Sequence, residues 1–284
     1  MNPESFTLPQ AKDKSHIKLS YVTHYYLDQK RPDSVLDLLA RYQGYAPELL
    51  DRIQFVVVDD CSPLRFDIPD LDLNILWLRI TDDIPWNQPG ARNLGVVYAA
   101  SDKILLTDID HEFPETTLNK MLGMRECGRD FFKIYRTDPA TGTLCKGHSN
   151  TFLLSRARFL RLYGYDEEFS GHYGSDDYRF VKFQKYHGSR QRYLPRKYRC
   201  IPRIDVDREE AYHGLERDLS HNSPIDARKE YEIKNFGRDA GHSRQFLRFR
   251  WELVLDRSRK VSVRPSKNRL WQKIWYWRWL VGER

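Results

Sequence analysis

Two aspartates separated by one residue, Asp108 and Asp110, stand in the segment TDIDHEFP. Carboxylates at positions i and i+2 of an extended or turning chain can reach one divalent cation, and their hard oxygens suit Mg²⁺ or Mn²⁺. Such a cation neutralises the charge that develops on a diphosphate leaving group. Turn or helix-cap aspartates are the alternative, but the apolar run KILL directly before this segment favours a metal site.

A second pair of acids, Asp59 and Asp60, ends the apolar run in VVVDDCS. An acid at the end of a strand can accept hydrogen bonds from the edge of a base or from ribose hydroxyls. A β-turn aspartate is the alternative interpretation of this motif.

A phosphate-binding segment is indicated by QPGARNLGV at 88–96. Gly90 permits close approach of a ligand, and Arg92 lies near the expected start of a helix, where anions are favoured. The alternative is an ordinary helix start with a solvated arginine. Neither GxGxxG nor GxxxxGK[ST] occurs, so the Rossmann dinucleotide and P-loop classes lose their main support.

The segment GYDEEFSGHYGSDDYRF at 164–180 combines glycines, aromatic residues and acids, as in a loop that closes over a ligand. The adjacent acids Asp176 and Asp177 diverge in a helical turn, so one of them can be a general base. The alternative is an acidic cap on a helix that begins near Tyr178, and the two interpretations are compatible. Further along, His213, His221 and His242 lie in a polar stretch, and one of them can complete a metal site.

Alternating strands and helices must position these residues. We expect strands at 17–25, 54–60, 74–80 and 103–110 and helices near 33–42 and 90–100. Continuous apolar runs are typical of strands buried on both faces, and the alternation predicts an α/β domain with a mainly parallel sheet. Ligands bind at the carboxyl ends of such strands, where all four strand-end aspartates would fall.

Composition and charge limit the remaining choices. No apolar run is long enough for a transmembrane helix, no secretory signal is visible, and the four cysteines are scattered, so a cytoplasmic chain is expected. From position 241 onward there are 12 Lys and Arg against 3 Asp and Glu, whereas the rest of the chain is nearly neutral. This distribution favours a local anionic partner over a protein-wide nucleic-acid surface.

Taken in order, VVVDDCS, GARNLG, TDIDHEFP and GYDEEFSGHYGSDD resemble the inverting GT-A glycosyltransferases of family 2 and the related galactosyltransferase group. The resemblance covers roughly 17–180, and the ordered combination is more specific than any single motif. It implies a GT-A fold, with 1–16 as an N-terminal extension, 17–240 as the catalytic domain and 241–284 as a basic, Trp-rich helical segment.

For the donor, the resemblance implies a nucleotide sugar, in first place a UDP-sugar. Asp60 or Asp59 would hold the uracil or the ribose, Arg92 would lie near the nucleotide, and Asp108 would touch the ribose or the metal.

For the metal and the acceptor, Asp110 would bind Mn²⁺ or Mg²⁺ directly, with His213 as the preferred distal ligand and His221 second. Asp176 would bind the acceptor sugar of a glycan or lipid-linked acceptor, and Asp177 would be the base that activates its hydroxyl with inversion at the anomeric carbon.

Two departures from the family pattern stand out. Cys61 occupies a position that is usually glycine, and the acid pair is Asp-Asp where Glu-Asp is usual. The second departure leaves open which of Asp176 and Asp177 is the base.

Two other functions compete with the glycosyltransferase interpretation. A sugar-phosphate nucleotidyltransferase would need a Gly-rich loop with Arg and Lys after the first strand, and LSYVTHYYLDQKRPDS has none. A non-enzymatic membrane- or nucleic-acid-binding protein would leave the four strand-end aspartates unexplained.

The C-terminal segment RLWQKIWYWRWLVGER favours an anionic membrane surface as a further partner, which would make the protein peripheral on the cytoplasmic face. Its basic residues suit anionic lipids, and tryptophan prefers the membrane–water interface. Packing of these tryptophans on the catalytic domain or at a dimer interface is the alternative. The residues concerned are Trp271, Trp275, Trp277 and Trp279.

Overall fold

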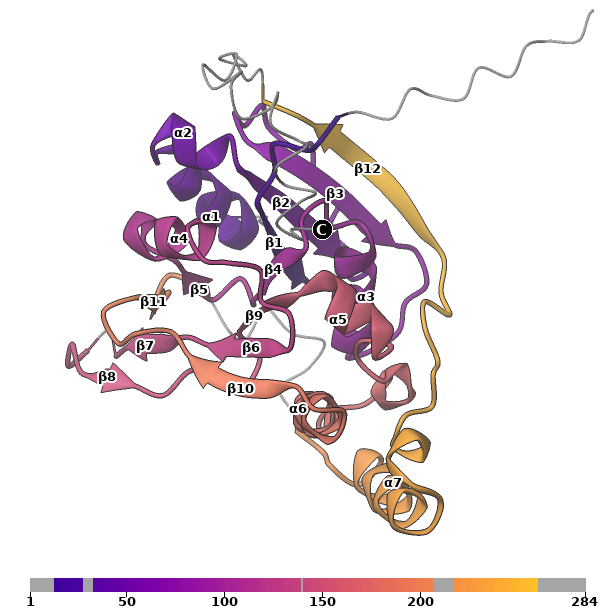
Figure 1. Ribbon diagram of the computed structural model, residues 1–284. Coiled ribbons are helices and arrows are strands. Elements are labelled where there is room, and N and C mark those ends of the chain that lie inside the picture. The colour runs from indigo at the N-terminus through magenta and orange to yellow at the C-terminus, as the bar shows by residue number, and fades with distance from the viewer. Residues whose placement is uncertain (1–12, 28–32, 139, 207–216, 260–284) are drawn as a thin grey trace, which may run out of the picture.

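A twisted sheet of eight strands forms the centre of the computed structural model, which describes residues 13–27, 33–138, 140–206 and 217–259 (Figure 1). In spatial order the strands are β10 (Arg190–Tyr193), β6 (Asp130–Lys133), β9 (Phe152–Ser155), β4 (Lys103–Leu106), β1 (Leu19–Tyr25), β2 (Ile53–Asp59), β3 (Asn74–Ile80) and β12 (Trp251–Arg257). The predicted α/β architecture with a mainly parallel central sheet is confirmed.

Helices cover both faces of this sheet. They are α1 (Asp33–Gln43), α2 (Pro47–Leu50), α3 (Gln88–Val97), α4 (Glu115–Leu122), α5 (Arg156–Arg161), α6 (Asp176–Tyr186) and α7 (Asn222–Phe236), with 3₁₀ turns η1 (Glu167–Phe169) and η2 (Arg238–Gly241). Within the described residues, a small second sheet has the order β5 (His111–Glu112), β11 (Arg199–Pro202), β7 (Tyr135–Thr137) and β8 (Leu144–Cys145).

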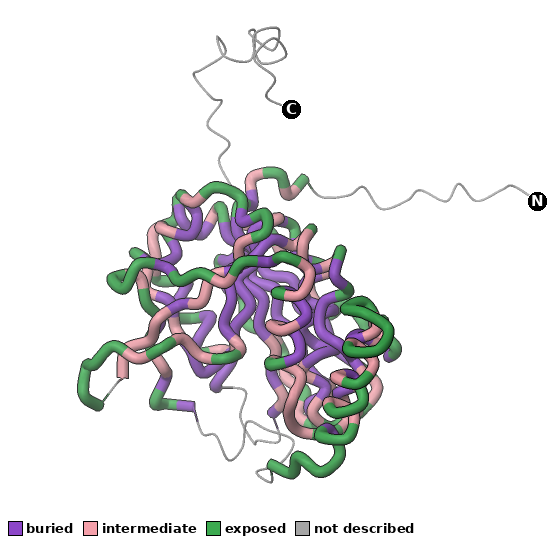
Figure 2. The backbone as a smooth tube through the Cα atoms, turned by 60° about the horizontal axis from the view of Figure 1, so that its bottom comes forward, coloured by how far each residue is buried: buried purple, intermediate pink, exposed green. Residues whose placement is uncertain are grey.

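Two apolar clusters divide the core, one on each face of the sheet. Tyr21 and Phe55 pack with α1, α2 and α4, whereas Val56 and Leu78 pack with α3, α5 and α6. Because side chains alternate along a strand, strands covered on both faces must be apolar at every position, as the runs in β2 and β3 are. Figure 2 shows these buried strands at the centre of the molecule.

The four parallel strands β3, β2, β1 and β4 all end at the same edge of the sheet. Strand β9 runs antiparallel to β4 and to β6, so its beginning lies at that edge, together with the ends of β6 and β10. Strand β12 also begins at this edge, since its Trp251 pairs with Ile80 at the end of β3. This edge, called the carboxyl edge below, therefore collects residues from all eight strands of the sheet.

The C-terminal part of the described chain differs from the helical segment expected from position 241. Strand β12 pairs antiparallel with β3, with a register irregularity between Leu253 and Leu255. The reason is that β3 would otherwise end the sheet with unpaired backbone groups, which a strand from any distance along the chain can satisfy. The expected Trp-rich segment beyond 259 lies outside the described residues, as do residues 1–12 of the expected extension at 1–16.

Candidate active site

Asp108 is the centre of a polar cluster at the carboxyl edge. Arg92 Nη2 donates to its Oδ1 at 2.5 Å and Asn150 Nδ2 to its Oδ2 at 3.2 Å. The Nδ1 atoms of His24 and His148 lie 4.0 and 3.9 Å from its carboxylate. Burial acts to raise the pKa of Asp108, but the neighbouring cations outweigh it and lower this pKa to about 2. Asp108 is therefore a permanently charged group at neutral pH.

Asp110, the second acid of the DxD pair, is buried and lies 2.5 Å from Nδ1 of the adjacent His111. Its backbone carbonyl accepts a hydrogen bond of 2.8 Å from the amide of Arg203, which holds the chain after β4 in place. The imidazole Nε2 of His111 is buried and has no hydrogen-bond partner among the described residues.

The side chains of Asp108, Asp110 and His111 do not complete a metal centre by themselves. Across the described part of the chain, no group of three or more His, Cys, Asp or Glu side chains is arranged to hold a metal ion. The carboxylate of Asp108 forms an ion pair with Arg92. The ring of His221 stacks on the ring of His172, with centroids 3.8 Å apart. The preferred distal ligand, His213, lies outside the described residues.

The two acids after β2 have different environments. Asp59 accepts from the amide of Ser62 at 2.8 Å and is ion-paired with Arg79, which also donates to the Ser62 carbonyl at 2.6 Å. Asp60 accepts from Asn87 Nδ2 at 3.3 Å, and burial raises its pKa well above the usual range. The carboxylate of Asp59 therefore holds the turn that follows β2.

The turn after β2 explains the Cys61 departure. Cys61 has φ of 59°, in the left-handed region that glycine adopts without steric cost. A glycine at this position would therefore adopt the observed backbone without strain.

Arg92 lies inside the protein, with only 2% of its surface exposed. Besides Asp108, its guanidinium donates to the carbonyl of Asn150 and to the hydroxyl of Tyr165, each at 2.8 Å. The prediction that this side chain would lie near the nucleotide stays a prediction.

The acid pair begins helix α6, two residues earlier than the start predicted near Tyr178. Gln88 Nε2 donates to Asp176 Oδ2 at 2.9 Å and to Asp177 Oδ1 at 3.3 Å, and the Tyr165 hydroxyl also lies 3.3 Å from Asp177 Oδ1. Burial raises the pKa of both carboxyls, and for Asp177 the like charge of Asp176 adds to the effect. A carboxyl tuned in this direction has the properties of a general base.

Asn93 joins two of the sequence motifs. Its side-chain amide accepts from the amide of Tyr165 at 2.8 Å and donates to the Tyr165 carbonyl at 2.9 Å and to Glu167 Oε1 at 2.8 Å. Glu167 in turn accepts from the amide of Leu247 at 2.8 Å. Asn93 therefore holds the GARN and GYDEEF segments together in this chain, and Glu167 is a structural acid.

Sequence reasoning missed several residues of this cluster. Tyr165 and Asn150 connect Arg92 to Asp177 and Asp108. Tyr165 stood inside the quoted segment 164–180 without a role, and Asn150 stood outside every quoted motif. Gln88 was inside a quoted motif, where it received no role. The remaining missed residues are His24, His111 and His148.

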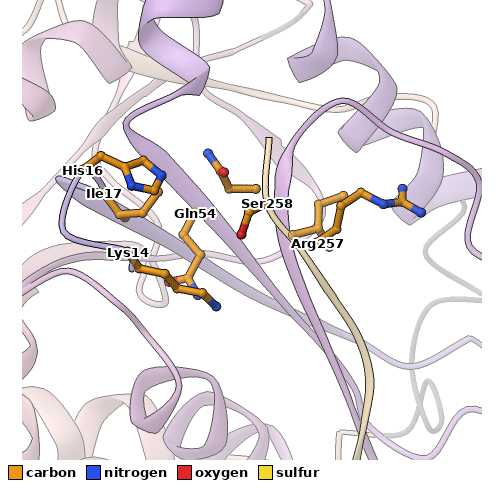
Figure 3. Close-up of a pocket in the computed structure, with 8 residues that line it drawn as sticks. Lys14, His16, Ile17, Gln54, Arg257 and Ser258 are labelled. Carbon is orange, nitrogen blue, oxygen red and sulfur yellow. The ribbon is translucent and has the colours of Figure 1, made fainter. Parts of the chain in front are cut away.

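A small hollow at the opposite edge of the sheet does not compete with this cluster. Figure 3 shows Lys14, His16 and Gln54 around it, and its volume of about 10 Å³ is room for about one water molecule.

Solved structures with the same arrangement of elements are nucleotide-sugar enzymes. S. aureus TarS in complex with UDP-GlcNAc is 14% identical, with a TM-score of 0.52 over 76% of this chain and 67% of that one. The fold is that of the GT-A glycosyltransferases.

Two further structures are less similar. TarS without the sugar nucleotide is 18% identical with a TM-score of 0.47 over 66% of this chain. The Pyrobaculum calidifontis mannosyltransferase PcManGT, in complex with GDP-Man and Mn²⁺, is 17% identical with a TM-score of 0.46 over 80% of this chain and 66% of that one. The match to this first TarS structure, of residues 1–349, covers 60% of the TarS chain.

At the level of sequence, no protein-family model matches this chain and no curated protein is significantly similar to it. Within the described residues, no helix is both long and apolar enough to cross a membrane.

Proposed function

We propose that this protein transfers a sugar from a nucleotide-diphosphate donor, in first place a UDP-sugar, to a hydroxyl of a glycan or lipid-linked acceptor with inversion. The observation that carries the proposal is the chain of contacts Asp108–Arg92–Tyr165–Asp177 at the carboxyl edge of a GT-A fold. It links the DxD motif, where a donor diphosphate would lie, to a carboxyl suited to deprotonate an acceptor. The nucleotide-sugar complexes of the structural neighbours support the same donor class.

In the proposed reaction, Asp177 takes the proton from the acceptor hydroxyl as its oxygen attacks the anomeric carbon. The new C–O bond forms on the face opposite the diphosphate, and the bond to the diphosphate oxygen breaks with its electron pair leaving on the nucleotide. Asp176, held by the same Gln88 amide, would orient the acceptor sugar. Asp60 would bind the uracil or ribose.

For Arg92 we propose a positioning role in place of direct contact with the nucleotide. Its buried guanidinium fixes Asp108 on one side and Tyr165 on the other. Its charge also opposes the rise in the pKa of Asp177 that burial causes, which keeps this carboxyl usable as a base.

Dependence on Mn²⁺ or Mg²⁺ is part of the proposal, with Asp110 as the protein ligand. Support comes from the Mn²⁺ in the mannosyltransferase complex. His213, which lies outside the described residues, is our candidate for a further protein ligand.

The deciding experiment is a screen of nucleotide sugars for slow donor hydrolysis by the purified chain with Mn²⁺ present. We expect one donor to release its nucleoside diphosphate, and EDTA to prevent this. Release of pyrophosphate from a nucleoside triphosphate and a sugar phosphate would instead identify a nucleotidyltransferase. Failure of every nucleotide to bind would remove the enzyme hypothesis.

A further inference from the structure

A basic surface lies beside the acid pair, outside the residues used so far. The segment 190–199, RQRYLPRKYR, has five Arg or Lys residues and no acid. Arg190 and Arg192 are satisfied by Asp130, at 2.6 and 3.0 Å. The charges that follow in the same segment are exposed to solvent at positions 196 and 197.

Tyr193 and Arg196 of this segment border a hollow of about 530 Å³ between β7, β8 and the chain at the end of β10. We call it the tyrosine groove, and its lining residues are Tyr135, Leu144, Lys146, Tyr193 and Arg196. Its lining therefore offers two aromatic rings, one aliphatic side chain and two cations, and it contains no carboxylate.

The two tyrosines form a single aromatic platform. The rings of Tyr135 and Tyr193 have centroids 4.9 Å apart and are tilted by 34°. Tyr193 is 37% exposed, so part of its ring is open to solvent. An aromatic face left open in this way suits the apolar C–H face of a sugar ring.

Among the described residues, no acid neutralises the two cations of this groove. Lys146 and Arg196 are exposed, and neither makes an ion pair with any residue that the structure describes. The Arg196 guanidinium lies 6.0 Å from the Tyr135 ring centroid, which places its charge over the platform.

The tyrosine groove adjoins the candidate active site through two strands. Tyr193 is the register partner of Lys133 in the parallel pair β10–β6, and Tyr135 follows Lys133 by two residues. Lys133 is close enough to Asp177 for the carboxylate to act on its pKa. From Lys146 the chain reaches Asn150 in four residues, a span of at most about 14 Å.

We propose that the tyrosine groove is an acceptor subsite for an anionic glycan, binding a sugar ring on Tyr135 and Tyr193 and its phosphate or carboxylate group at Lys146 and Arg196. This inference rests on the proposed glycosyl transfer, in which Asp177 is the base: a glycan bound in the tyrosine groove would extend toward Asp177 as the acceptor. Single-stranded RNA is the competing ligand, since it also combines flat rings with negative charge.

The test uses the purified full chain without donor, so that its outcome is independent of whether a nucleotide sugar is found. Calorimetry compares a hexameric oligogalacturonate, a mannose 6-phosphate oligosaccharide, neutral maltohexaose and poly(U). We expect at least one acidic oligosaccharide to bind about tenfold more tightly than maltohexaose. Tighter binding of the oligogalacturonate would identify a carboxylate ligand, and tighter binding of the mannose 6-phosphate oligosaccharide a phosphate ligand.

Matched variants locate the binding site. Tyr193→Ala and Lys146→Glu should each weaken acidic-glycan binding about tenfold, while UDP binding stays unchanged. Tyr231→Ala and Lys234→Glu make the same chemical changes on exposed positions of α7, away from the tyrosine groove (Figure 1), and should change affinity less than twofold.

Arg196→Glu is a second charge reversal in the tyrosine groove should Lys146→Glu fold poorly. The proposal is overturned if neither acidic oligosaccharide binds better than maltohexaose, if poly(U) binds more tightly than both, or if the α7 variants weaken binding as much as those in the tyrosine groove. Loss of UDP binding with acidic-glycan binding intact would contradict the proposed function and leave this subsite standing.

Discussion

The hydroxyl of Tyr165 accepts a hydrogen bond of 2.8 Å from Arg92, which leaves its own proton free for a carboxylate. Asp177 Oδ1, at 3.3 Å, is in position to accept it. The ring itself is buried and stacks on Phe180 with centroids 4.2 Å apart, so this hydroxyl has one fixed position.

Tyr165→Phe should lower turnover roughly 3- to 30-fold, because one hydrogen bond to a charged group is lost while the ring packing remains. The Tyr165 hydroxyl lowers the pKa of Asp177, so its removal raises this pKa and moves the acid limb of the pH–rate profile to higher pH. The profile of kcat against pH measures the shift. An acid limb that stays in place would show that Tyr165 acts only through packing.

Asp177→Asn should reduce turnover by about 10²–10⁴-fold and leave UDP affinity unchanged, as expected for a general base. Asp176→Asn removes a like charge, which lowers the pKa of Asp177 and moves the acid limb of the remaining activity to lower pH. If Asp176→Asn is inactive and Asp177→Asn nearly normal, the two roles are exchanged.

Asp177→Asn should also make the protein more stable at neutral pH. The folded-state pKa of Asp177 is raised above its ordinary value of 3.8, so the folded state holds more protons than the unfolded one between these two pKa values. Its contribution to stability is therefore lost as the pH rises through that interval, and a neutral Asn escapes this loss. Thermal unfolding at pH 5 and pH 8 should show a larger gain in Tm at pH 8.

Asp110→Asn should abolish the Mn²⁺-dependent part of UDP binding, because an amide is a far weaker ligand for a hard cation than a carboxylate. Calorimetry with UDP in the presence and absence of Mn²⁺ gives the result. The control is Asp70→Asn, an equivalent change at a side chain that is 95% exposed. Unchanged Mn²⁺ dependence in Asp110→Asn would remove this residue from the metal site.

Cys61→Gly should stabilise the protein by a net ~0.5–1 kcal/mol. Relief of strain in the left-handed conformation stabilises the folded state by about 1–2 kcal/mol. The greater conformational entropy of glycine in the unfolded chain offsets part of this gain. Cys61→Ala is the control, because it keeps the Cβ and should show no such gain. Denaturant unfolding distinguishes the two variants, and equal stability would mean that the positive φ carries no strain.

Removal of 266–284 tests the proposed membrane association of the Trp-rich segment. The truncated chain should remain folded and active on a soluble acceptor but no longer sediment with anionic liposomes at low salt, because the basic and tryptophan side chains are gone. An insoluble truncated chain, or a full-length chain that ignores liposomes, would assign this segment a structural role.

Local pattern was sufficient for the framework of the fold. Strand β3 has the predicted bounds, 74–80, and β1 and β2 differ from prediction by two residues or fewer, because unbroken apolar runs have few other stable placements in water. The same runs placed Asp60 and Asp108 at one edge of the sheet before any contact was known. The predicted strand at 103–110 was too long, since β4 ends at Leu106 and the two acids of the DxD pair follow in a turn.

The sequence by itself determined the α/β class, the strand ends and the acids that follow them, since these depend on interactions between near neighbours in the chain. Only the tertiary structure decided that Arg92 turns inward to Asp108, that Tyr165 reaches Asp177, and that 251–257 closes the sheet as β12. Each of these three contacts joins segments that are distant in the sequence. Their backbone and charged groups find partners only once the chain has folded, so no local spacing encodes the contacts.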